Sequence, residues 1–425
     1  MFELPRGTRD FPPKEMQKRR YVEEEFRRVF ESYGYQEIQT PTFEQLELFT
    51  AKSGEAILDE MYDFTDKGNR HLALRPELTA PVIRMYVDQL QMEPKPIKLF
   101  YFGNCYRYDR PQKGRYREFL QAGCELIGTN TAEAIAELIS LSMDLFRQIG
   151  LSRIDLEIGN LKLLSHVFDA LSLTEEQRDL LLPSIDKEEY EDVEQLLYEW
   201  NVDETNITDF MTLLADNDIN TLYNLLDTNH QVTEEIKRLN QILELLKNHF
   251  SIPTVQINMG IVRGLDYYTG IVFEIKAPAL GAEKQICGGG EYSLISLFGG
   301  RETPTSGFAL GFDRTIVAME EENISFPLRN LQYYLIPVTD DMIPPALELI
   351  SSLRRTYHIK CDVDLLGRGV GKALKYANSQ DASYAIIMGP DEFKDHQVTL
   401  RNMKTGDQTQ IDIEKFISNP KNIET

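Results

Sequence analysis

The chain is poor in cysteine and histidine. Its 425 residues include four cysteines, which lie far apart and form no C-x-x-C pair, and six scattered histidines. This spacing argues against a disulfide framework, a zinc site and a histidine-rich metal cluster. We therefore expect reduced thiols in a cytoplasm and no structural metal.

Long apolar runs are also absent from the sequence. No apolar segment approaches the roughly 20 residues that a membrane helix needs. The first residues, "MFELPRGTRDF", lack a basic segment followed by an apolar core, so we expect no signal peptide. These absences predict a cytoplasmic protein with no membrane partner.

Two common nucleotide-binding signatures are missing. The glycine-rich stretch "CGGGEYS" lacks the G-x-x-x-x-G-K-[ST] spacing of a phosphate loop, and no G-x-G-x-x-G follows a predicted strand. The sequence therefore indicates neither a Walker site nor a Rossmann dinucleotide site.

The net charge of −23 argues against general nucleic-acid binding, because phosphate contacts need lysine and arginine. The charge is unevenly spread, however. Residues 107–117, "RYDRPQKGRYR", contain five basic residues and one acidic residue, whereas residues 174–205 are crowded with Asp and Glu. A basic island on an acidic body is compatible with local phosphate binding.

The length predicts two or three domains, and a hydrophobic content of 42% is that of an ordinary globular protein. Residues 14–33 have the spacing of an amphipathic helix. Residues 96–128 predict two antiparallel strands joined by a loop at 110–117. Residues 131–149 predict a helix with Thr131 as its cap.

Two later segments differ in texture. Residues 163–250 lack glycine and repeat Leu, Glu and Asp at helical spacing, which predicts an all-helical insertion. Pro327 marks a linker, and strands and helices alternate from residue 331, which predicts a compact α/β domain with mainly parallel strands. The expected parts are 1–162, 163–250, 251–326 and 331–425.

Arg107 stands at the loop end of the predicted strand pair. Arginine on a rigid element can hold a phosphate through two hydrogen bonds. Gln121 and Glu125 lie four residues apart on the returning strand and therefore share a face. Taken alone, these residues favour a salt-bridged surface hairpin over a ligand site.

Glu77 and Thr79 lie between two prolines in "LRPELTAPVIRM". A carboxylate and a hydroxyl in this arrangement suit an ammonium group. Capping of a helix by Thr79, with Glu77 near its start, is the simpler reading and is favoured when the stretch stands alone.

Three further stretches combine glycine with charged or phenolic residues. "GFALGFDR" ends at Arg314, and its glycines permit close backbone approach, either for a ligand or in a tight strand–helix corner. "IVRGLDYYTG" contributes Arg263, Tyr267 and Tyr268, and "CGGGEYS" leads to Tyr292. Packing of the tyrosines at a strand edge is a fair explanation of "IVRGLDYYTG" when that stretch stands alone.

The order of these stretches is more specific than any one of them. A strand ending in Pro41, an arginine-bearing hairpin and a glycine-rich strand–helix ending at Arg314 resemble the three motifs of class II aminoacyl-tRNA synthetases. The chain is more narrowly similar to the histidyl-tRNA synthetase family. "RGLDYYTG" and "CGGGEY" resemble its two histidine signatures, and "YRYDRPQKGRYREFLQAGCELIG" resembles its motif 2. The resemblance covers nearly the whole chain.

The resemblance implies an α/β multidomain fold: a class II antiparallel-sheet catalytic core, a helical insertion and a C-terminal α/β anticodon-binding domain. It implies a homodimer that activates L-histidine with ATP and Mg²⁺, giving histidyl-adenylate and pyrophosphate. The histidyl group is then moved to the terminal adenosine of tRNA(His).

The resemblance also implies residue roles. Arg263, Arg107 and Gln121 are the expected catalytic residues, Arg115 and Arg314 join Arg107 at ATP, and Lys113 and Arg117 are expected near the acceptor end of the tRNA. The residues expected to bind histidine are Glu77, Leu78, Thr79, Arg107, Gln121, Glu125, Arg263, Tyr267, Tyr268 and Tyr292.

The second signature departs from the family pattern. It usually reads glycine–arginine–tyrosine–aspartate, and here it reads Gly290, Glu291, Tyr292, Ser293. The arginine and the aspartate of the family pattern are therefore not there to hold this turn in place.

One rival is the synthetase paralogue that serves as the regulatory subunit of ATP phosphoribosyltransferase. Such paralogues lack the C-terminal domain and tend to lose the catalytic arginines. The three arginines Arg107, Arg263 and Arg314 and the domain from residue 331 favour the enzyme. A synthetase for another amino acid is a second rival, but "RGLDYY" is not expected there.

Overall fold

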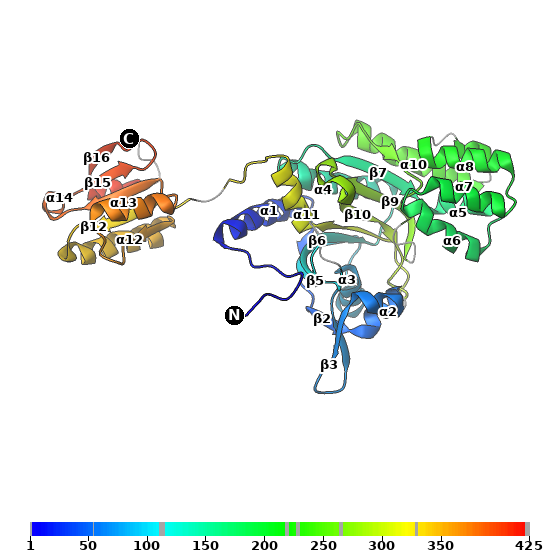
Figure 1. Cartoon of the computed structure of the whole chain (residues 1–425), viewed down its shortest axis with the longest axis horizontal. Helices are drawn as coiled ribbons and strands as arrows, with labels where there is room; N and C mark the ends of the chain where they lie inside the picture. Colours follow the sequence, from blue (N-terminus) through cyan, green and yellow to red (C-terminus); the bar gives the residue numbers. More distant parts are fainter. Residues whose placement is uncertain are drawn as a thin grey trace. The chain divides into compact units, whose positions relative to one another are not determined.

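The computed structural model describes residues 2–53, 55–109, 115–216, 221–226, 230–262, 267–327 and 330–420. The chain divides into two compact units, Met1–Phe326 and Pro327–Thr425 (Figure 1). Each unit has its own cluster of buried apolar side chains. Within the described ranges, every helix is either too short or too polar to span a bilayer.

The first unit is built on an eight-stranded sheet in which most neighbouring strands run antiparallel. Only the short strands at its two edges, β1 and β8, pair in parallel with their neighbours. In spatial order the strands are β1 (Gln36–Glu37), β5 (Ile97–Tyr106), β6 (Glu118–Ile127), β11 (Thr305–Gly311), β10 (Gln285–Tyr292), β9 (Tyr268–Lys276), β7 (Asp155–Asn160) and β8 (Gln256–Ile257).

Aromatic side chains attach the long helices to this sheet. The bounds are α1 (Pro13–Ser32), α4 (Ala132–Gln148) and α11 (Phe312–Glu321). Phe26 of α1 is fully buried, and its ring meets those of Phe146 on α4 and Phe312 on α11 edge to face. Phe30, one turn later, stacks on Phe100 of β5. These contacts explain the apolar spacing that predicts the first helix.

The predicted strand pair is confirmed. β5 and β6 pair from Ile97 opposite Ile127 to Tyr106 opposite Glu118, and residues 110–114 of the loop lie outside the described residues. The predicted cap of the following helix is also confirmed, because the Ala134 N–H donates to the Thr131 hydroxyl over 3.3 Å.

The predicted helical insertion is helical as expected, although its first helix begins at Leu161, directly after β7. Its last helix, α10, packs on α4 and α5 (Figure 1). The insertion contains α5 (Leu161–Ala170), α6 (Glu175–Asp186), α7 (Tyr190–Glu199), α8 (Glu204–Asp216), α9 (Leu222–Leu225) and α10 (His230–Asn248).

A smaller three-stranded sheet lies beside helices α2 and α3. Its strands, in spatial order, are β2 (Phe43–Gln45), β4 (His71–Leu74) and β3 (Tyr62–Thr65), and the helices are α2 (Leu46–Ser53) and α3 (Thr79–Met85). Short helical turns complete the first unit at η1 (Glu55–Glu60), η2 (Tyr86–Leu90) and η4 (Pro278–Glu283).

The second unit is the predicted α/β domain. Its parallel strands are followed by an antiparallel hairpin, which the sequence pattern does not distinguish from a single strand. The strand order is β13 (Cys361–Val363), β12 (Tyr333–Pro337), β14 (Tyr384–Met388), β15 (Gln397–Asn402) and β16 (Gln408–Asp412). The helices are η5 (Asp340–Met342), α12 (Ile343–Tyr357), α13 (Val370–Ser379), α14 (Pro390–Lys394) and α15 (Ile413–Ser418).

We predict that residues 331–425 fold as an independent domain, because this unit has its own core. In that fragment Leu353→Ala should lower the free energy of unfolding by about 2–5 kcal/mol, since the side chain is fully buried in α12. Urea denaturation followed by circular dichroism measures the loss. Leu347→Ala on the same helix is the control, because Leu347 is 43% exposed and its truncation should cost little. A fragment without a cooperative transition would contradict the prediction.

Candidate active site

Two adjoining pockets open on the large sheet where β6, β9, β10 and β11 lie side by side. The inner pocket has a volume of about 120 Å³, and the outer pocket has a volume of about 500 Å³, within the roughly 300–1,000 Å³ of small-molecule sites. Both are lined by Arg107, Gln121, Tyr267, Tyr268 and Ala309. The remaining lining of the inner pocket is Lys52, Glu77, Thr79, Glu125, Tyr292, Gly307 and Phe308.

Glu125 forms the floor of the inner pocket. Its carboxyl group accepts hydrogen bonds from the Tyr101 hydroxyl, over 3.0 Å, and from the Tyr292 hydroxyl. Burial raises the pKa of Glu125 to about 8, although both phenols act in the opposite direction. A Cβ on Gly307 would lie 2.0 Å from the carboxylate, so only glycine fits at this position of β11. Glu125 can therefore exchange a proton or hydrogen bond with a ligand near neutral pH.

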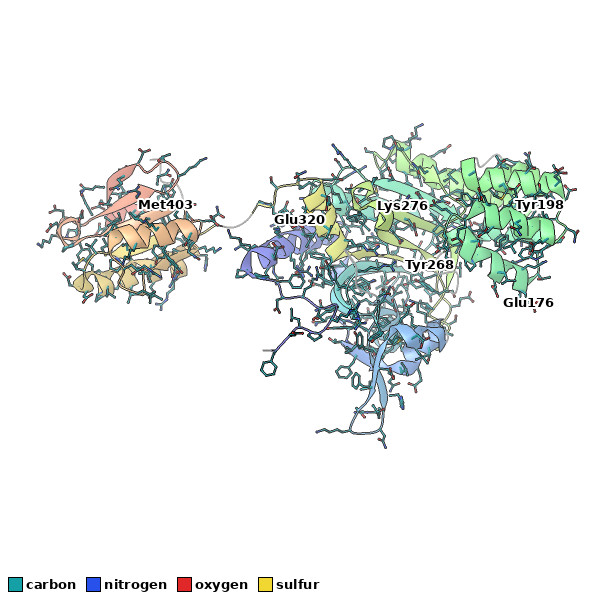
Figure 2. The ribbon with its side chains drawn as sticks, viewed as in Figure 1. Glu176, Tyr198, Tyr268, Lys276, Glu320 and Met403 are labelled. Carbon is teal, nitrogen blue, oxygen red and sulfur yellow. The ribbon has the colours of Figure 1, made fainter. Side chains whose placement is uncertain are left out.

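Two tyrosines at the start of β9 form a wall of the inner pocket. The rings of Tyr267 and Tyr268 lie 4.4 Å apart, and each meets the Tyr292 ring at a steep angle. Burial raises the pKa of the Tyr268 hydroxyl well above its usual range, so it stays protonated (Figure 2 marks its position). The three rings form a flat-sided polar pocket suited to a planar group.

Glu77 caps helix α3. The expectation that Thr79 caps this helix is therefore wrong. The Glu77 carboxylate accepts the N–H groups of Thr79, over 2.6 Å, and of Ala80, over 3.0 Å, whereas the Thr79 side chain makes no cap. A carboxylate satisfies the exposed N–H groups of a helix start and interacts favourably with the helix dipole. Thr79 instead lines the inner pocket.

The sequence gives no sign of Lys52 in this pocket. Its ammonium lies 3.3 Å from the Glu77 carboxylate and 4.2 Å from the centre of the Tyr267 ring. Burial is the largest single influence and lowers the pKa of Lys52, but the charge of Glu77, its hydrogen bond and the Tyr267 phenol together leave the pKa above its ordinary value. The inner pocket therefore contains a fixed positive charge next to Glu77.

Arg107 and Gln121 stand where the two pockets meet. Arg107 directly follows the last residue of β5, and its Nε donates to the Pro76 carbonyl over 3.0 Å. Gln121 of β6 accepts the N–H of Leu78 over 3.1 Å, which ties β6 to the start of α3. Both side chains are thus held on rigid elements between the pockets.

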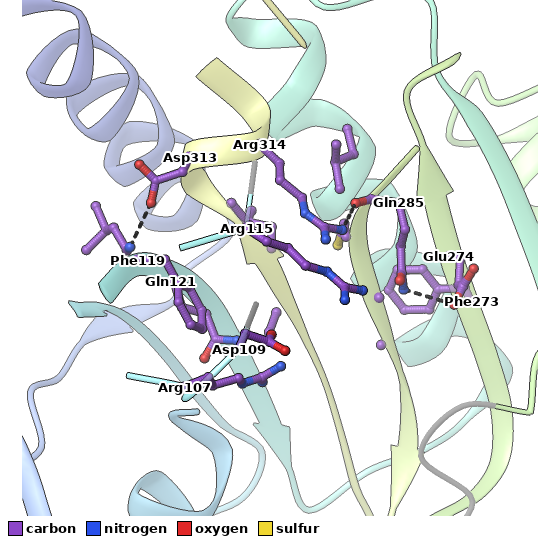
Figure 3. A pocket seen from close by; sticks show the side chains of 18 of the residues that line it. Arg107, Asp109, Arg115, Phe119, Gln121, Phe273, Glu274, Gln285, Asp313 and Arg314 are labelled. Carbon is purple, nitrogen blue, oxygen red and sulfur yellow. Dashed lines mark hydrogen bonds between the residues drawn. The ribbon is translucent and has the colours of Figure 1, made fainter. Parts of the chain in front are cut away.

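Arginines from separate elements surround the outer pocket. Figure 3 shows Arg107, Arg115 and Arg314 pointing into it. Arg314 lies in the first turn of α11, and its guanidinium donates to the Gln285 carbonyl over 2.9 Å. The Glu274 carboxylate lies on the β9 side of the same pocket and accepts from the Gln285 amide over 2.9 Å. The lining contains these three arginines and four acidic residues, Glu60, Asp109, Glu274 and Asp313. The guanidinium groups are suited to a phosphate chain, to which they can donate paired hydrogen bonds.

Asp313 is a second residue whose role cannot be read from the sequence. It is 4% exposed, and its carboxylate accepts the Leu120 N–H over 3.0 Å and the Arg9 guanidinium over 2.7 Å. The Arg19 guanidinium also binds it. Asp313 thereby joins the N-terminal segment, α1 and β6 to the start of α11, next to Arg314.

Some predicted site residues are not placed in either pocket. Arg263 and Lys113 lie outside the described residues. Arg117 packs its guanidinium over the Tyr108 ring and donates to the Asp109 carbonyl over 3.1 Å, and it lines neither pocket. The Leu78 side chain is buried, and its backbone N–H faces Gln121.

Comparison with known proteins identifies two sequence families in the chain. Residues 7–315 match the family described as histidyl-tRNA synthetase, and residues 332–422 match the family described as anticodon binding domain.

Named relatives and a solved structure agree with this match. The histidine–tRNA ligase of Archaeoglobus fulgidus is 42% identical over 423 residues, which cover 98% of each chain. That of Methanocaldococcus jannaschii is 43% identical, covering 98% of this chain and 99% of the relative. The crystal structure of apo histidyl-tRNA synthetase from S. aureus has a TM-score of 0.73 and 28% identity, covering 98% of this chain and 99% of that one.

The raised pKa of Glu125 predicts a pH-dependent effect of Glu125→Gln. An unfolded glutamate has a pKa of about 4.3, so between that value and about 8 the folded protein retains a proton that the unfolded chain loses. Rising pH therefore destabilises the native protein, by up to about 1.4 kcal/mol per pH unit, and the glutamine variant lacks this loss. The melting temperature of the variant relative to the native protein should rise from pH 5 to pH 8 in ligand-free samples. Glu93→Gln, at an exposed position, is the control; a pH-independent difference for Glu125→Gln would contradict the assignment.

Proposed function

Because this chain belongs to the histidyl-tRNA synthetase family, we propose that it has histidine–tRNA ligase activity. It joins L-histidine to ATP, releases pyrophosphate and transfers the histidyl group to the terminal adenosine of tRNA(His). The observation that supports this most directly is the shared border of the two pockets at Arg107 and Gln121. An amino acid in the inner pocket and a nucleotide in the outer pocket would meet at this border.

The first chemical step brings two anions together. A histidine carboxylate oxygen forms a bond to the α-phosphorus, and the bond from phosphorus to the bridging oxygen breaks, with its electron pair leaving on pyrophosphate. Positive charge must compensate the approach, and arginine remains charged when water is removed. We assign this task to Arg107 and Arg263, with Gln121 near the carboxylate.

The phosphate chain of ATP is assigned to the outer pocket. Arg115 and Arg314 would both bind it, and Arg314 would hold the γ-phosphate end. Mg²⁺ is expected to enter as part of the ATP substrate, and the Glu274 carboxylate offers the oxygen ligands that Mg²⁺ prefers. The positive charge of Mg²⁺ would lower the repulsion among the phosphate groups.

The histidine substrate is assigned to the inner pocket. Glu77 uses three of its roughly four acceptor positions on Thr79, Ala80 and Lys52, which leaves about one for the substrate ammonium. Thr79 and the Leu78 backbone lie beside it. The imidazole nitrogens would pair with Glu125 and Tyr268, between the rings of Tyr267 and Tyr292. Apolar competitors would leave these buried groups unpaired and bind weakly.

RNA contacts are proposed for two parts of the chain. Lys113 and Arg117 belong to the basic loop and would meet the acceptor end, and residues 332–422 match an anticodon-binding family. The same match favours the ligase over a regulatory paralogue without this domain. We further propose a homodimer in the cytoplasm, where the four buried thiols would stay reduced.

ATP–pyrophosphate exchange with each amino acid in turn tests the activity. Exchange should require histidine and be weak with other amino acids, because the polar inner pocket penalises side chains that cannot pair with it. Absence of histidine-dependent exchange from protein with a cooperative thermal transition would refute the proposal.

The role of Arg263 has its own test. Arg263→Ala should lower the exchange rate by about 10²–10³-fold, as for the loss of a contact that stabilises transition-state charge. The melting temperature should remain close to that of the native protein. Arg153→Ala, at an exposed position of the same unit, serves as the matched control and should leave exchange unchanged. Near-normal activity of Arg263→Ala would return Arg263 to a structural role.

A further inference from the structure

Glu291 is a buried carboxylate beside the inner pocket, at the position where the family pattern has arginine. It is 3% exposed and lies on β10 directly before Tyr292. The guanidinium of Arg238 binds both of its oxygens, over 2.6 and 3.0 Å. The backbone N–H of Ile271 donates to the same carboxylate over 2.7 Å. Paired ionic hydrogen bonds of this kind are strong and fix the direction of both side chains.

The carboxylate sits inside a β-bulge. β9 and β10 pair regularly from Ile275 opposite Cys287 to Val272 opposite Gly290, and the next partners are Tyr268 opposite Tyr292. Residues 269–271 of β9 are therefore opposite Glu291 alone. Such bulges re-aim the side chains next to them, and here the re-aimed residue is Tyr268 of the inner pocket.

Gly270 makes room for this arrangement. A Cβ at this position would lie 2.2 Å from the Glu291 carboxylate oxygen, closer than atoms can approach. The last glycine of "IVRGLDYYTG" is thus required by the carboxylate of the second stretch. The stretches "IVRGLDYYTG" and "CGGGEYS" therefore pack directly against each other at Gly270 and Glu291.

Arg238 brings the helical insertion to the bulge. It stands on α10, lies 3.9 Å from Glu235 of the same helix and donates to the Asn130 carbonyl. Glu235 in turn accepts from Lys162 over 2.7 Å and from Asn160 over 3.3 Å, at the junction of β7 and α5. The guanidinium is therefore held by several elements before it meets Glu291.

We propose that Arg238 and Glu291 are a positioning pair through which the helical insertion sets the amino-acid pocket. The pair fixes the β9 bulge, which places Tyr268, and it fixes the part of β10 that presents the Tyr292 hydroxyl to Glu125. Neither residue lines the inner pocket, so they act through the tyrosines. This inference rests on the proposed function, because it takes the inner pocket to be the histidine site.

The kinetic test compares histidine and ATP in the full-length protein. Arg238→Ala and Glu291→Ala should raise the KM for histidine by about 10- to 100-fold, since displacements near 1 Å at a site have effects of this size. The KM for ATP should change less than about twofold, because neither Arg238 nor Glu291 lines the outer pocket. Arg238→Lys keeps the charge but loses the paired geometry, and it should give an intermediate KM for histidine.

Arg178→Ala is the matched control. Arg178 forms an ion pair with Asp169 inside the insertion, over 2.5 Å, without reaching β9. Its removal should leave both KM values unchanged. If the histidine KM is unchanged in Arg238→Ala and Glu291→Ala, or if the ATP KM rises equally, the proposal is wrong.

Hydrogen exchange separates this inference from the proposed function. Glu291→Ala and Arg238→Lys should accelerate amide exchange in residues 268–272 by at least about tenfold, while Arg178→Ala should not. If the native protein lacks histidine-dependent ATP–pyrophosphate exchange, the proposed function fails, and the amide measurement still decides whether the pair fixes the bulge. Unchanged amide exchange in both variants would overturn the inference. Because Arg238→Lys retains an ionic partner for Glu291, it tests the pair even if the alanine variants do not fold.

Discussion

A single buried carboxyl group connects the strands on which the inner pocket depends. Glu125 extends from β6, accepts hydrogen bonds from the hydroxyls of Tyr101 on β5 and Tyr292 on β10, and lies against Gly307 on β11. Burying such a group is costly unless its oxygens are hydrogen-bonded or protonated, and here both remedies apply. The two phenols and the glycine on β11 are the features that accommodate this one side chain.

Carboxylates also orient the cations around the pockets. Glu77 holds Lys52 and Glu291 holds Arg238, each with low exposure on the acidic side. Asp313 similarly receives guanidinium groups from the N-terminal segment and α1. Removing one partner of such a buried pair would leave an uncompensated charge, so the geometry is fixed more strongly than by surface ion pairs.

Many of the helices, strands and motifs of the protein can be predicted from its sequence. Local periodicity and turn residues predict the strand pair ending near Arg107, the helix capped by Thr131 and the helical insertion. Resemblance to a family assigns Glu125, Tyr268 and Arg314 to one site, and the structure brings these three residues to the two pockets. The reading of Thr79 as a cap is wrong, because the choice between two neighbouring polar residues depends on which of them turns toward the helix start.

The sequence by itself determined the motif order and many of the helices and strands, because the periodicity of a helix or strand depends on interactions within a few residues of chain. Only the tertiary structure decided that Lys52 enters the inner pocket and that Arg238 pairs with Glu291. These contacts join distant segments, and no local period encodes them. The raised pKa of Glu125 has the same origin, because removal of water is a property of the assembled strands and not of the residue.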